Sequence, residues 1–114
     1  LGLGINISGG SDCPVEPFDL LPNLACAVTR TDPTMPGAKP WHPEQCLSVE
    51  EAVRVFTQGA AYASFEEDER GTLSVGKVAD FAVLSRDIFT INPNEIGSTK
   101  VEMTVVDGEI AWEK

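Results

Sequence analysis

The chain has 114 residues, and 8 basic against 18 acidic side chains give it a formal net charge of −10. This charge argues against a nucleic-acid backbone or an anionic membrane as a partner, because both need clustered Lys and Arg. A content of 42% hydrophobic and 23% charged residues is that of one globular domain or a piece of one, and argues against disorder.

The three cysteines, Cys13, Cys26 and Cys46, are an odd number at wide spacings, with no CxxC motif. We therefore expect free thiols in a reducing compartment, the cytoplasm. No apolar run approaches the length of a membrane span, and no signal peptide is present, so we expect no membrane partner. The first residue is Leu rather than Met, which leads us to expect a piece of a longer protein.

The first half of the chain predicts a strand and then a helix. Residues 3–8 are short, apolar and bounded by glycines, which is typical of a buried strand. Residues 18–29 follow helical spacing, with Asp19 as a plausible N-cap and Pro22 in the first turn, where its missing N–H costs little. Residues 31–43 carry four prolines and predict a long loop, a lid or rim segment, with Trp41 and His42 near its end.

Residues 48–65 are the clearest predicted helix. Ser48 and Glu51 form an S-x-x-E capping box, and one apolar stripe follows. Small residues, Gly59 among them, would allow this helix to approach a sheet closely. The acidic run at residues 66–69 is typical of a solvated loop or helix end, and its spacing fits no EF-hand calcium loop.

The last third predicts β-structure. We expect strands at residues 80–85, 101–106 and 109–112, forming a small antiparallel or mixed sheet. The Asp107-Gly108 pair between the last two strands is a strong hairpin signal and usually gives a type I′ turn.

Asp12 is the candidate functional residue. It follows the predicted strand and Gly9-Gly10, and in parallel α/β barrels the side chains at strand C-termini converge on the face that carries the chemistry. A carboxylate there needs a cation or hydrogen-bond donors to offset its desolvation. As a bare pattern, however, Asp12 is more typical of a helix N-cap.

Four segments together resemble the C-terminal end of the amidohydrolase superfamily of metal-dependent hydrolases, in its amidohydrolase family 3 branch. They are GGSDCPVEPFD (9–19), SVEEAVRVFTQGAAYASF (48–65), GTLSVGKVADFAVLS (71–85) and VEMTVVDGEIAW (101–112). The most specific pieces are GSDxPV at residues 10–15 and VGKVADFAVL at residues 75–84.

The resemblance implies an α/β fold: the terminal strand–helix part of a distorted (β/α)₈ barrel, followed by strands of an accompanying β-sandwich. Residues 3–8 would then be the eighth barrel strand, 48–65 a closing helix and 80–112 sandwich strands. The implied domain division is residues 1–70 for the barrel part and 71–114 for the sandwich part.

The resemblance also implies an enzyme that hydrolyses a non-peptide C–N bond in a small molecule. Asp12 would ligate a catalytic divalent metal, usually zinc, and pass protons for the attacking water. The family also needs an H-x-H pair and further histidines, whereas this chain has one histidine, His42, and catalytic zinc usually takes three protein ligands. We therefore expect this piece alone to hold no metal and to be inactive; its substrate-binding residues are unknown.

Several alternatives remain open. Cys13, His42 and Cys46 could form a small zinc site, or His42 could be an exposed loop residue and the cysteines small core residues. Cys13 could be a nucleophile, and Trp41 could close over a substrate or be a buried aromatic. The chain could instead be a non-catalytic α/β module used for self-association, a possible homo-oligomer. Residues 3–8 are predicted to pair with the β portion or with another molecule.

Overall fold

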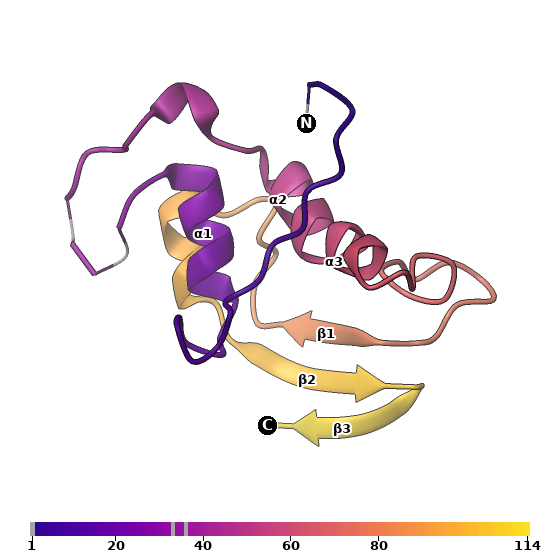
Figure 1. The fold of residues 1–114 in the computed structure, drawn as a ribbon. Coiled ribbons are helices and arrows are strands. Elements are labelled where there is room, and N and C mark those ends of the chain that lie inside the picture. The colour runs from indigo at the N-terminus through magenta and orange to yellow at the C-terminus, as the bar shows by residue number, and fades with distance from the viewer. Residues whose placement is uncertain (1, 33, 36) are drawn as a thin grey trace. The chain divides into compact units, whose positions relative to one another are not determined.

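The computed structural model describes residues 2–32, 34–35 and 37–114, and their ribbon is drawn in Figure 1. They form two compact units. The first comprises the described residues of Leu1–Gly9, Arg54–Ser85 and Lys100–Lys114, and the second those of Gly10–Val53 and Arg86–Thr99. Within the described ranges, no helix is both long and apolar enough to cross a bilayer.

A three-stranded antiparallel sheet lies in the first unit, in the order β1-β2-β3 (Figure 1). Its strands are β1 (Phe81–Leu84), β2 (Val101–Val106) and β3 (Glu109–Glu113), which confirms the three predicted strands. Asp107 and Gly108 have φ angles of 51° and 78°, the two positive values that a type I′ hairpin turn requires. The predicted antiparallel sheet and its hairpin are thus present.

The Asp80 carboxylate holds this hairpin turn against the start of β1. One oxygen, Oδ1, accepts the Asp107 backbone N–H at 2.8 Å, and Oδ2 lies 3.4 Å from Nη1 of Arg70. Beside it, the Gly108 N–H donates to the Ala79 carbonyl at 3.1 Å. One side chain therefore connects the turn, the first strand and the loop that carries Arg70.

The predicted helix at residues 48–65 is two helices, α2 (Val49–Phe56) and α3 (Gln58–Ala63), so the single-helix prediction is wrong. The break is at Thr57, where φ is −118° and ψ is −79°. The capping box at the start of α2 is confirmed in both directions. The Glu51 carboxylate accepts the Ser48 N–H at 2.8 Å, and the Ser48 hydroxyl accepts the Glu51 N–H at 3.1 Å.

Leu3 lies in a turn, Gly4 has a positive φ of 71°, and residues 4–8 belong to no helix or strand, so the assignment of residues 3–8 as a buried strand is wrong for the described chain. The side chains of Leu3, Ile5 and Ile7 are 87%, 62% and 46% exposed. Pairing with the β portion is also wrong, because within the described residues the sheet consists of β1, β2 and β3. A strand needs a hydrogen-bonded neighbour, and none of the three lies beside this segment. Pairing with another molecule remains a prediction.

The helices hold this segment. The Gly9 N–H donates to the Val55 carbonyl at 3.1 Å. Near the start of α3 the Ile7 backbone lies so close to Gly59 that a Cβ there would be 2.1 Å from the Ile7 carbonyl oxygen. The predicted close approach to small helix residues therefore exists, but its partner is this segment rather than a sheet.

In the second unit, α1 (Leu21–Thr29) packs beside the 3₁₀ helix η2 (Pro93–Ser98) (Figure 1). Leu21 and Leu24 of α1 and Ile96 of η2 are buried. The prediction of a helix is confirmed with a later start, and Pro22 lies in the first turn. Asp19 accepts the Leu21 N–H at 3.0 Å, although the N-cap position itself is Leu20. A second short 3₁₀ helix, η1 (Pro43–Gln45), precedes α2.

The end of α3 has the hydrogen bonds of a Schellman motif. The Glu66 N–H donates to the Ala61 carbonyl at 2.9 Å, and the Phe65 N–H donates to the Tyr62 carbonyl at 3.1 Å. Phe65 occupies the left-handed position of this motif, with φ 61°, and is 92% exposed. Glycine is the usual residue there, because a side chain in this conformation is strained. The acidic run at residues 66–69 follows the end of α3, as predicted for a solvated helix end.

We predict that Gly59→Ala destabilises the protein. Alanine favours a helix by about 1 kcal/mol over glycine, but its Cβ would overlap the Ile7 carbonyl, and overpacking costs about 1–3 kcal/mol. Thermal unfolding should show a melting temperature lowered by several degrees. The control is Gly10→Ala, whose Cβ would meet open space. An unchanged or raised melting temperature for Gly59→Ala would contradict the contact.

Phe65→Gly should stabilise the end of α3. Glycine removes the strain of a left-handed φ, and we expect the free energy of unfolding to rise by about 0.5–1 kcal/mol after its extra unfolded-state entropy. Urea unfolding measures this change. Ser64→Gly, at a right-handed position one residue earlier, should instead lose about 0.5–1 kcal/mol. A lower free energy of unfolding for Phe65→Gly would show that the Phe65 ring makes stabilising contacts, and would contradict this prediction.

Asp80→Ala and Asp80→Asn separate the two contacts of this carboxylate. Alanine removes both, leaving the Asp107 N–H without its acceptor, and should cost about 1–3 kcal/mol of unfolding free energy. Asparagine keeps an acceptor oxygen and loses only a partly exposed ion pair, at a cost of about 1 kcal/mol or less. Equal losses in chemical denaturation would show that charge, rather than the hydrogen bond, matters.

Candidate functional site

The candidate site is the tight turn that presents Asp12. The Val15 N–H donates to the Asp12 carbonyl at 2.9 Å, and the Glu16 N–H donates to the Ser11 carbonyl at 3.1 Å. Asp12 has a φ of 50°, a left-handed conformation that aspartate adopts more readily than most residues. The Cys13–Pro14 peptide bond in this turn is cis. Local backbone bonds therefore define where Asp12 stands on the turn.

The Asp12 side chain is exposed, and no hydrogen bond or ion pair joins its carboxylate to another residue in the described part of the chain. The alternative that Asp12 is a helix N-cap is wrong, because α1 begins only at Leu21 and its N-cap position is Leu20. The turn thus displays an acidic side chain whose oxygens accept no hydrogen bond from the described residues.

A metal centre is not assembled by these residues alone. Among residues 2–32, 34–35 and 37–114, no three His, Cys, Asp or Glu side chains come together as a group that could hold a metal ion. Asp12 supplies one oxygen donor of a suitable type, whereas catalytic zinc usually takes three protein ligands. The described residues therefore offer Asp12 as a single oxygen donor and do not form a metal site by themselves.

The structure does not bring Cys13, His42 and Cys46 together as a zinc site. Nδ1 of His42 instead lies 2.8 Å from Oε1 of Glu44, and His42 is exposed, as one alternative predicted. All three cysteines are free, which confirms the predicted free thiols. They are exposed, so the alternative of small core residues is wrong. A nucleophilic role for Cys13 remains a prediction.

Trp41 is 70% exposed, so its assignment as a buried aromatic is wrong. Its backbone pairs with Arg30: the Trp41 N–H donates to the Arg30 carbonyl at 2.8 Å, and Nε of Arg30 donates to the Trp41 carbonyl at 3.0 Å. The Arg30 guanidinium also lies 5.0 Å from the centre of the indole ring, a cation–π contact. Arg30 is therefore a cation–π neighbour of a ring that stays mostly exposed, and closure over a substrate remains a prediction.

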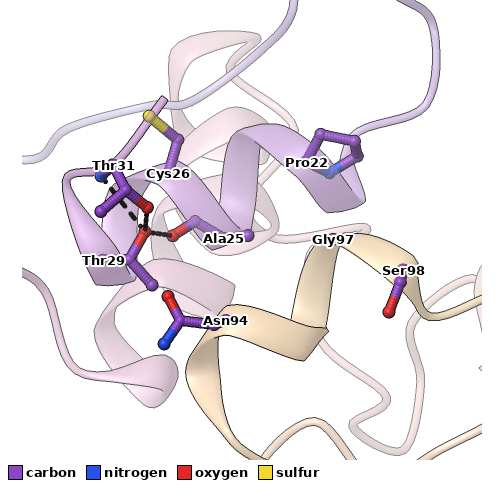
Figure 2. Close-up of a pocket in the computed structure, with 8 residues that line it drawn as sticks. All are labelled: Pro22, Ala25, Cys26, Thr29, Thr31, Asn94, Gly97 and Ser98. Carbon is purple, nitrogen blue, oxygen red and sulfur yellow. Dashed lines mark hydrogen bonds between the residues drawn. The ribbon is translucent and has the colours of Figure 1, made fainter. Parts of the chain in front are cut away.

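A groove of about 400 Å³ lies between α1 and η2 in the second unit (Figure 2). One wall carries the Thr29 hydroxyl, which donates to the Ala25 carbonyl at 2.8 Å and lies 2.7 Å from the Thr31 hydroxyl. The lining is uncharged and consists of Pro22, Ala25, Cys26, Thr29, Thr31, Asn94, Gly97 and Ser98. Sequence reasoning missed it, because no motif indicates that residues 94–98 pack against α1.

Two exposed carboxyl groups have pKa values below their ordinary range. The Glu44 backbone N–H, followed by the His42 ring, lowers the pKa of the Glu44 carboxyl. The Thr34 hydroxyl and then the Thr34 backbone N–H lower the pKa of Asp32. Both effects come from hydrogen bonds that favour the ionised carboxylate; Asp32 lies in the loop after α1, and Glu44 lies in η1.

Known proteins match the fold and the segments described above. A sequence profile of the amidohydrolase family matches residues 1–111. The chain is 38% identical over 97% of its length to YtcJ of Bacillus subtilis, named as an amidohydrolase, and covers 21% of it. It is 33% identical over 100% of its length to N-substituted formamide deformylase of Arthrobacter pascens, covering 20% of that protein.

A solved structure agrees with these matches. The crystal structure of an amidohydrolase from Thermotoga maritima MSB8 aligns with 97% of this chain and 24% of that chain, at a TM-score of 0.66 and 25% identity. The chain therefore belongs to the amidohydrolase family. Its place is in the family 3 branch, as the four segments predicted, and it spans about a fifth of the length of the curated relatives described here.

Two hydrogen bonds to the Glu44 carboxyl, from its own backbone N–H and from the His42 ring, predict how this group titrates. His42→Ala should raise the pKa of Glu44 only part of the way to its ordinary value, because the backbone N–H, the larger cause, remains. Carbon-13 NMR of the carboxyl groups against pH measures this change. Thr34→Val is the control: it should raise the pKa of Asp32 and leave that of Glu44 unchanged. An unaltered Glu44 titration in His42→Ala would contradict the contact.

Proposed function

We propose that the full-length protein is a metal-dependent hydrolase that cleaves a non-peptide C–N bond in a small molecule. The observation that carries this proposal is the family match over residues 1–111, because it includes the turn that presents Asp12. The name of the Arthrobacter relative supports an N-substituted formamide as the first substrate class to test.

In this proposal Asp12 is one ligand of a divalent ion, zinc by preference, and the other ligands come from residues outside this chain. Such an ion supplies acidity, because it lowers the pKa of a coordinated water to about 7. The Asp12 carboxylate takes up a proton from the attacking water and returns it to the leaving nitrogen. The free oxygens and exposed position of Asp12 support both roles.

The proposed setting is the barrel and sandwich implied by the sequence. Residues 3–8 would be a barrel strand, and β1, β2 and β3 would be sandwich strands, with the division near residue 70. The likeness to the Thermotoga structure supports this arrangement. The exposed apolar side chains of Leu3, Ile5 and Ile7 support it too. Neighbouring barrel strands from the rest of the protein would bury them, as the strands of a parallel barrel are buried on both faces.

The test uses the full-length protein with its metal content measured, assayed on a panel of N-substituted formamides and small cyclic amides. Asp12→Asn keeps the size of the side chain but removes its charge, and should lower kcat by about 10²- to 10⁴-fold. Glu16→Gln is the matched control, because this exposed carboxylate lies in the same turn, and it should retain wild-type kcat. Full turnover by Asp12→Asn would refute the assignment.

A second candidate is a non-catalytic module used for self-association. The exposure of Leu3, Ile5 and Ile7 favours it, since exposed apolar side chains are often covered by a partner. Light scattering distinguishes the two. A metal-free oligomer that becomes monomeric on Ile5→Asp would support the module, whereas a metal-loaded protein with hydrolytic activity would exclude it.

A further inference from the structure

We draw no further inference here: the strongest candidate, the groove between α1 and η2, is lined by uncharged side chains and nothing in the structure shows what fills it.

Discussion

The close contact between the Ile7 backbone and Gly59 is the constraint on which the first unit depends. The missing side chain at Gly59 lets the Ile7 segment lie on the helix where a Cβ would be 2.1 Å from a carbonyl oxygen. The bond from the Gly9 N–H to the Val55 carbonyl fixes the end of that segment. Both contacts lie within the first unit, so they order residues 7–9 on the helices.

Signals that lie within a few residues of one another predicted structure correctly. Asp107-Gly108 specified the hairpin, and Ser48 with Glu51 specified the start of α2, because each pair contains all the groups that its motif needs. Two other predictions, the strand at residues 3–8 and the single helix at residues 48–65, failed. Residues 3–8 have the pattern of a buried strand, but no strand of the described chain lies beside them. The break between α2 and α3 at Thr57 lies within a continuous apolar stripe, and the spacing of that stripe does not indicate where the helix breaks.

The candidate site was predictable in part. Asp12 stood out after the glycines, and the family resemblance supplied the role proposed for it. The structure adds a turn closed by two backbone bonds and a carboxylate without a partner among the described residues. The groove of α1 and η2 was not predictable, because its walls come from segments more than sixty residues apart in the sequence. The exposure of Trp41 was not predictable either, because no local motif indicates its contacts with Arg30, eleven residues earlier in the chain.

The central claim is that Asp12 is displayed to hold a metal ion jointly with groups from outside this chain. The most direct measurement is a crystal structure of the full-length protein grown with zinc, with anomalous scattering recorded at the zinc edge. We expect a zinc peak about 2.0–2.2 Å from a carboxylate oxygen of Asp12. A fully occupied zinc site among histidines, with the Asp12 carboxylate outside the coordination shell, would contradict it.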